Sequence, residues 1–125
     1  MTPSDINGPL TQTSVSAIAA RTATVTATGI DISSYKGGII VQQLVGVVSG
    51  TTPTLDGKLQ SSPDNSTWSD ISGATFTQVT ATDNFQKIGI QVPAAARYLR
   101  YVGTIAGTTP SFTMGVVLLG QKERV

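Results

Sequence analysis

Apolar and polar residues alternate with a period of two over several short segments of the chain, which is typical of β-strands. Residues 22–28 place alanine and valine on one side and four threonines on the other, as a half-buried strand does. Residues 85–92 alternate in the same way, with Ile88 and Ile90 on one face. Residues 39–48 form a nearly continuous apolar run, which predicts a central strand covered on both faces.

Further strands are expected where apolar segments lie between Gly, Pro, Asn and Ser residues. We expect residues 55–61 to form a hairpin with residues 39–48. Residues 98–105 and 111–119 are expected to form a final hairpin. The remaining predicted strands are residues 13–18, 67–71 and 74–79. Eight or nine short strands at regular spacing predict an all-β, single-domain β-sandwich or barrel.

Polar segments frame this domain at both ends of the chain. Residues 1–12 contain two prolines and only two large aliphatic side chains, Ile6 and Leu10, so we expect an extended N-terminal arm. We interpret Ile6 and Leu10 as anchors that reach a neighbouring subunit. The β-sandwich domain is then predicted to span residues 13–120, followed by a polar C-terminal tail at 121–125.

One short sequence occurs twice. Gly50-Thr51-Thr52-Pro53-Thr54-Leu55 recurs 57 residues later (107 minus 50) as Gly107-Thr108-Thr109-Pro110-Ser111-Phe112. Proline cannot donate to a strand ladder and is tolerated where a strand begins, so each copy predicts a turn between two strands. We favour two hairpins that share the same turn chemistry, and an ancient duplication is the alternative.

The alternation also predicts which side chains form the core. The predicted core residues are Val25, Ile40, Leu44, Leu59, Trp68, Phe76, Ile88, Ile90, Leu99 and Val117. The runs 39–48 and 116–119 hold more large aliphatic side chains than one face of a single sandwich can bury. This excess predicts that the protein self-associates, as a dimer or trimer.

Composition narrows the function. The 125 residues include 8 basic and 7 acidic side chains, and only 12% are charged, so no basic stripe for nucleic acid is expected. The chain has no Cys and no His, which removes thiol nucleophiles, the commonest general base and the commonest zinc ligand, and its single glutamate is Glu123. We expect neither an enzyme nor a cofactor or metal site. No apolar run is long enough to predict a membrane span.

Three local clusters could bind a ligand, and each also has a structural interpretation. Asp64-Asn65-Ser66 lacks the spacing of a calcium loop and is typical of a turn. Trp68 could offer a platform to a ligand, but a lone tryptophan on a short strand is more often core. Arg97 and Arg100, next to Tyr98 and Tyr101, could form an aromatic-basic patch, but we favour arginine stems that cover a sheet face or pair with Asp.

Residues 57–71, Gly-Lys-Leu-Gln-Ser-Ser-Pro-Asp-Asn-Ser-Thr-Trp-Ser-Asp-Ile, followed by Arg97-Tyr98-Leu99-Arg100, resemble the capsid decoration (cement) proteins of tailed bacteriophages. The segments Ile30-Asp31-Ile32-Ser33-Ser34-Tyr35 and Gly115-Val116-Val117-Leu118-Leu119-Gly120 also fit this resemblance. It covers about residues 28–120. It implies a jelly-roll β-sandwich without catalytic residues. The same skeleton is also similar to discoidin-type carbohydrate-binding jelly rolls.

The resemblance implies a virion structural protein on the capsid exterior, with the phage major capsid protein as its partner. A carbohydrate-binding module and a tail or head-completion component are the alternatives. The loops at both Gly-Thr-Thr-Pro turns lack aromatic residues, which counts against sugar binding. The candidate partner-binding residues are Ile6, Leu10, Tyr35, Arg97 and Arg100.

Overall fold

The computed structural model describes residues 10–91 and 97–122, and every regular element within them is a β-strand. In chain order the strands are β1 (Leu10–Arg21), β2 (Val25–Thr26), β3 (Ile30–Asp31), β4 (Tyr35–Ser62), β5 (Ser69–Thr75), β6 (Asn84–Gln91) and β7 (Tyr98–Lys122). The predicted all-β fold class is therefore confirmed.

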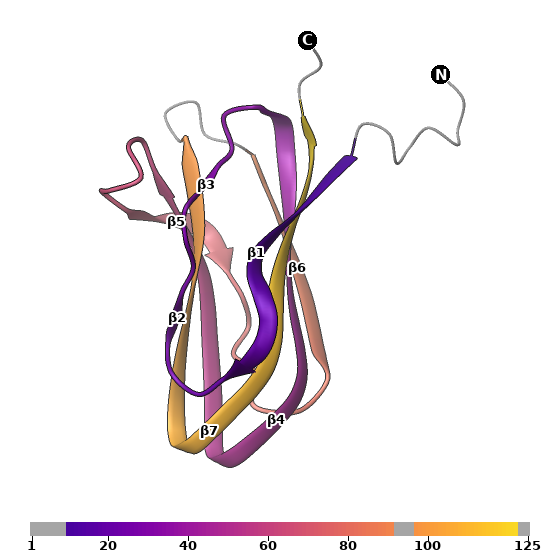
Figure 1. Ribbon diagram of the computed structural model, residues 1–125, viewed down its shortest axis with the longest axis vertical. Coiled ribbons are helices and arrows are strands. Elements are labelled where there is room, and N and C mark those ends of the chain that lie inside the picture. Colours follow the sequence, from indigo (N-terminus) through magenta and orange to yellow (C-terminus); the bar gives the residue numbers. More distant parts are fainter. Residues whose placement is uncertain (1–9, 92–96, 123–125) are drawn as a thin grey trace, which may run out of the picture.

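Two long strands, β4 and β7, organise the fold because they pair along nearly their whole lengths. Residues 39–48 of β4 pair with residues 112–120 of β7, and residues 54–62 of β4 pair with residues 98–106 of β7. Both strands bend sharply in the middle, at the bottom of Figure 1. One antiparallel sheet is thereby folded into two layers that face each other.

The two layers have equivalent strand orders. Layer one consists of β6, the first half of β4, the second half of β7 and β1. Layer two consists of β5, the second half of β4, the first half of β7, and the short β2 and β3. With β2 and β3 counted as one edge, each layer has four strands, as in a jelly roll. The β-sandwich prediction is confirmed, and the described residues form seven strands, two of which serve both layers.

The repeated Gly-Thr-Thr-Pro segments lie side by side at the bend. Gly50 and Gly107 adopt φ angles of 110° and 122°, which favour glycine. A Cβ atom on Gly50 would lie 2.6 Å from the carbonyl oxygen of Thr109. A Cβ atom on Gly107 would lie 2.7 Å from the carbonyl oxygen of Thr52. Each copy of the repeat is therefore a corner at which its strand passes from one layer to the other.

Both predicted hairpins are consequently wrong. Residues 55–61 pair with residues 99–105 of β7 and not with residues 39–48. The two halves of β7, 98–105 and 111–119, likewise lie in different layers. Glycine and proline at positions of unusual backbone geometry suit a corner as well as a chain reversal, so turn chemistry alone could not distinguish the two.

The edges of the sandwich also differ from the predicted strands. Residues 22–28 contribute only the two-residue strand β2, and the predicted strand 74–79 contributes the end of β5 and one isolated bridge between Val79 and Leu55. At the N-terminus, β1 already begins at Leu10, so the last three residues of the expected arm belong to the sheet. Residues 1–9, 92–96 and 123–125 lie outside the described residues.

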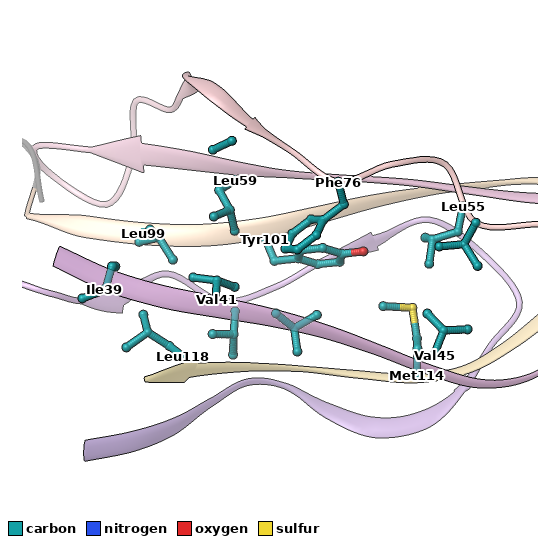
Figure 2. Packing of buried hydrophobic residues seen from close by; sticks show 14 of the residues in the cluster. Ile39, Val41, Val45, Leu55, Leu59, Phe76, Leu99, Tyr101, Met114 and Leu118 are labelled. Atoms are coloured by element: carbon teal, nitrogen blue, oxygen red, sulfur yellow. The ribbon is translucent and has the colours of Figure 1, made fainter. Parts of the chain in front are cut away.

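The core lies between the two layers, as Figure 2 shows. Of the predicted core residues, Leu59, Phe76 and Leu99 are buried. Six others are half-buried at its margins or on the outer surfaces: Val25, Leu44, Trp68, Ile88, Ile90 and Val117. Ile40 is 42% exposed, and its prediction as a core residue is wrong.

The error at Ile40 has a physical cause. Residues 39–48 are apolar on both faces, so alternation could not indicate which face points inward. The inward face carries Ile39, Val41 and Val45, each at most 1% exposed, together with the polar Gln43. Each face of this run carries one glutamine, Gln43 inward and Gln42 outward, so the polar positions did not distinguish the two faces either.

Candidate functional site

The outward surface of layer one carries apolar side chains from all four strands. We call this set the outer apolar face, and its members are Ile18, Ile40, Leu44, Phe85, Val117 and Leu119. Ile18 is 72% exposed and Phe85 is 69% exposed. Isolated exposed apolar residues are common, whereas a group that spans a whole sheet is a candidate interaction surface.

Apart from Val117, these residues lie in two rows across the layer. In one row Phe85 of β6 is opposite Leu44 of β4, which is opposite Gly115 of β7. A Cβ atom on Gly115 would collide with Ile18, so the Ile18 side chain lies over this glycine. In the other row Ile40 is opposite Leu119 on one side and Gly89 on the other.

A more polar row separates the two apolar ones. It contains Lys87 of β6, Gln42 of β4 and Val117 of β7, in register, with Ser14 of β1 at its end. An apolar centre with few charges is the composition expected of the buried part of a protein interface. The outer apolar face can therefore be covered by a partner with little loss of charge hydration.

The outer surface of layer two is different, because its polar side chains bind one another. Arg100 donates from Nε to Oε1 of Gln60 at 2.8 Å, and its guanidinium lies 4.4 Å from the centre of the Trp68 ring. Gln60 in turn donates to Asp70 at 2.8 Å, and Asp70 forms an ion pair with Lys58 at 3.1 Å. These bonds, that from Gln60 foremost, hold the pKa of Asp70 below its ordinary range.

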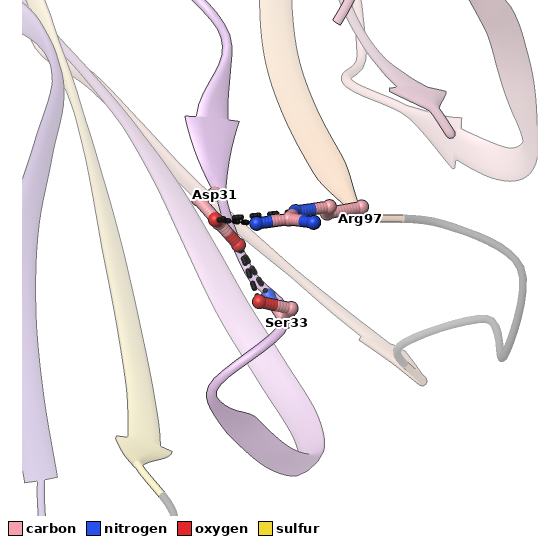
Figure 3. Close-up of polar contacts among 3 residues, drawn as sticks. All are labelled: Asp31, Ser33 and Arg97. Carbon is pink, nitrogen blue, oxygen red and sulfur yellow. Dashed lines mark hydrogen bonds and ion pairs between the residues drawn. The ribbon is translucent and has the colours of Figure 1, made fainter. Parts of the chain in front are cut away.

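Arg97 joins β3 to the start of β7, as Figure 3 shows. Its Nη2 atom lies 3.3 Å from Oδ2 of Asp31, and its carbonyl accepts a hydrogen bond from the N–H of Ile32. The other oxygen of Asp31 accepts from the hydroxyl and the N–H of Ser33, at 2.6 and 2.9 Å. The Ser33 bonds, with a smaller effect of Arg97, lower the pKa of Asp31.

The structure does not bring the five sequence-predicted partner residues together. Ile6 lies outside the described residues, and Leu10 is the first residue of β1. Tyr35 is only 6% exposed, and its hydroxyl lies 2.9 Å from Oγ1 of Thr13. Arg97 and Arg100 serve contacts within the chain, in line with the interpretation that they cover a sheet face.

Asp64 and Trp68 also have structural roles. One Asp64 oxygen accepts from the N–H groups of Ser66 and Thr67, each at 2.9 Å, and the Ser62 hydroxyl donates to it at 3.0 Å. These bonds, led by that from Thr67, lower the pKa of Asp64. Within residues 10–91 and 97–122, no three His, Cys, Asp or Glu side chains gather as a metal site would require.

Ile18 and Phe85 were not predicted as functional residues from the sequence. Ile18 lies within the second of two register irregularities of β1, so its face could not be counted from the start of the strand. Phe85 lies on the polar side of an otherwise correct alternation with Ile88 and Ile90. The excess of aliphatic residues in 39–48 was the signal that pointed to an exposed apolar face.

Comparison with known proteins supports the fold assignment. No protein-family model and no curated protein matches the chain. Among solved structures, the chain is similar to part of one from the Gx strain of infectious bursal disease virus, with a TM-score of 0.62 and 15% identity. The match covers 88% of this chain and 31% of that viral chain.

A second similar structure is the SPBc2 prophage-derived protein YomS, with a TM-score of 0.50 and 12% identity over 89% of this chain and 95% of that one. At these identities the similarity shows a shared fold. The described residues contain no helix of the length and apolarity needed to cross a membrane.

Proposed function

We propose that this chain is a non-enzymatic structural protein of a tailed-phage particle, a decoration protein that binds the outside of the head. In this role it clamps neighbouring major capsid subunits. The observation that carries the proposal is the outer apolar face, since the described residues leave Ile18, Ile40 and Phe85 exposed on it. The two structural neighbours, one from a virus and one derived from a prophage, are consistent with this choice.

Stabilisation of the head would follow from mass action. A protein that binds the assembled lattice but not free subunits shifts the equilibrium toward the lattice, and many modest sites add their effects. Ile18 and Phe85 are 72% and 69% exposed to solvent, so contact with a capsid subunit can bury much of each residue. Burial of one such side chain is worth about 2 kcal/mol, or more than tenfold in affinity.

The carbohydrate-binding alternative receives less support from the geometry. It depends on Trp68 as an exposed platform, but the Arg100 guanidinium already lies 4.4 Å from the ring centre. The Cη2 and Cζ2 edge of the same ring lies over Gly29, close enough to collide with a Cβ atom there. The ring is thus engaged in holding the loop before β5 against the segment before β3.

Co-sedimentation with phage heads tests the proposal. Purified protein is mixed with expanded and unexpanded heads of the phage that encodes it, and head melting is followed by calorimetry. We expect wild-type protein to bind expanded heads and raise their melting temperature. Ile18→Lys should weaken binding about tenfold or more. Thr104→Lys, an exposed site on layer two, is the matched control and should bind normally.

Two results would contradict the proposal. One is a wild-type protein that sediments alone at every head concentration. The other is equal binding by wild-type and Ile18→Lys, since the outer apolar face would then not be the contact.

A further inference from the structure

The two edges of layer one are built differently. Strand β1, at one edge, has two register irregularities against β7, between Ser14 and Ser16 and between Ser16 and Ala19. Bulges of this kind twist an edge and discourage pairing with another chain. Strand β6, at the other edge, pairs with β4 through eight consecutive residues without any irregularity. Figure 1 shows β6 as a straight strand at the side of the sandwich.

The outer edge of β6 has few of the usual protective features. Within the described part of the chain, β6 pairs with β4 alone, so its other side presents unpaired backbone N–H and C=O groups. The strand has no proline and one charged residue, Lys87. Phe85 is 69% exposed, and a Cβ atom on Gly89 would meet nothing within 4 Å.

On its inner side, β6 is firmly held. The Gln86 side chain accepts from the N–H of Thr77 at 2.8 Å and donates to the carbonyl of Thr77 at 2.9 Å. It also donates to the side chain of Asn84 at 2.8 Å. A strand fixed on one side and regular on the other is preorganised for pairing, because little conformational entropy remains to be lost.

We propose that two copies of this chain associate through their β6 strands, which pair antiparallel about a two-fold axis. The two layer-one sheets then form one continuous sheet. Layer one has four strands in each copy, so the joined sheet has eight (4 + 4). The two outer apolar faces become neighbours on one side of this sheet.

Side-chain chemistry selects the register of the pair. In an antiparallel pair, directly opposed side chains point to the same side of the sheet. The two-fold axis must therefore pass midway between the two copies of one residue, which oppose each other. An axis at Lys87 would place two lysines opposite each other, which is unfavourable. An axis at Ile88 places Lys87 opposite Gly89 of the partner subunit and Phe85 opposite Gln91 of the partner subunit. The open space above Gly89 accommodates both the lysine and the diagonal phenylalanine.

Sedimentation velocity from about 1 to 200 µM tests the dimer, since an interface of this small size is expected to dissociate in the micromolar range. Gly89→Lys is the diagnostic variant. Its side chain meets open space in the single chain, but it opposes Lys87 of the partner subunit in the dimer. We expect its dimer dissociation constant to rise at least tenfold while its melting temperature stays at or above the wild-type value.

Ser14→Lys is the matched control, because it adds the same charge to the opposite edge of layer one. It should leave the dimer intact. A wild-type protein that stays monomeric throughout the range overturns the proposal, as does a Gly89→Lys variant that dimerises normally. Equal disruption by Ser14→Lys would indicate a general charge effect and would also overturn it.

Cysteine cross-linking tests the register, because the natural chain has no cysteine. Opposed residues in an antiparallel pair have Cα atoms about 4.5–5.5 Å apart, within the range of a disulfide. Lys87→Cys and Gly89→Cys proteins should cross-link when mixed under mild oxidation, and neither should cross-link efficiently alone. Efficient cross-linking of either protein alone, or none in the mixture, would overturn the register.

The dimer proposal stands apart from capsid binding. If Gly89→Lys is monomeric yet still binds heads, the dimer is confirmed as a separate property and the proposed function stands. If wild-type protein dimerises but ignores heads, only the proposed function fails.

Discussion

Removal of one hydroxyl group from the centre of the core should show how much a hydrogen bond between the two layers contributes to the free energy of unfolding. Tyr101 points inward from layer two and Gln43 points inward from layer one, and both are fully buried. The Tyr101 hydroxyl donates to Oε1 of Gln43 with an oxygen–oxygen distance of 2.5 Å. Figure 2 shows the Tyr101 ring within the core, beside the ring of Phe76. The perturbation is Tyr101→Phe.

Tyr101→Phe should lower the free energy of unfolding because Gln43 keeps a buried acceptor that has lost its donor. Tyr101→Phe keeps the ring and its edge contact with Phe76, whose centre is 6.0 Å away. It leaves Oε1 of Gln43 buried without its donor, and a stranded buried acceptor costs about 2 kcal/mol of unfolding free energy. For a chain of this size, that loss lowers the melting temperature by roughly 6–10 °C.

A double-mutant cycle separates this bond from general packing. Gln43→Met leaves the Tyr101 hydroxyl buried without its acceptor and should lower the free energy of unfolding by a similar amount. It also removes Nε2 of Gln43, a buried donor that has no partner within the described residues. The double variant has no stranded polar group at this bond, so we expect it within about 1 kcal/mol of wild type.

Urea unfolding followed by the fluorescence of Trp68, the single tryptophan, gives the free energies. Tyr98→Phe, a half-buried tyrosine on the same strand, is the control and should change stability little. Burial raises the pKa of Tyr101 above its ordinary value of 10.0. Its protonated form therefore contributes stability below pH 10, which is lost as the pH rises through the folded-state pKa.

The wild-type advantage over Tyr101→Phe should consequently shrink in alkaline buffer. A Tyr101→Phe protein as stable as wild type at neutral pH would contradict this role of the hydroxyl. It is equally contradicted if the costs of Tyr101→Phe and Gln43→Met simply add in the double variant.

Three further predictions concern other parts of the fold. Gly57→Ala should strongly lower the melting temperature, because its Cβ would collide with the Tyr101–Gln43 pair. Gly89→Ala should leave the melting temperature unchanged or raise it, and equal effects of the two variants would contradict this prediction. Asp31 and Asp64 have lowered pKa values, so their ionised forms stabilise the fold above about pH 4, and this stability is lost as the pH falls through the folded-state pKa values. A melting temperature that stays constant from pH 5 to about 2 would contradict this prediction. Deletion of residues 2–9 should weaken binding to heads or to a second copy, and unchanged affinity would show the arm to be idle.

The fold class was predictable from sequence because period-two alternation and turn residues are local signals. Leu59 and Leu99 were identified as core for the same reason, since each lies on a strand with one clearly apolar face, and Phe76, directly after β5, continues the alternation of the buried Ala74. Alternation fails where both faces are apolar. In residues 39–48, burial is decided by which face meets the opposite layer, and that depends on contacts far away in the sequence.

The candidate site was harder to predict because exposure is a property of the assembled sheet. Arg97 and Arg100 had the composition of a binding patch, yet Asp31 and Gln60, distant in sequence, already bind them. Phe85 had no distinguishing motif. Its exposure follows from the position of β6 at an edge of layer one, which no local pattern encodes.

The repeated Gly-Thr-Thr-Pro sequence shows how one local signal can have a non-local cause. At a corner shared by two paired strands, both strands must change direction at the same level, so both need the same backbone geometry. Thr52 and Thr109 adopt φ angles of 47° and 46°, unusual for a β-branched residue, and each hydroxyl donates to the preceding carbonyl at 2.8 Å. Gly50 and Gly107 each lie against the backbone of the other copy. Paired geometry alone is thus sufficient to explain the repeat, without a duplication of the chain.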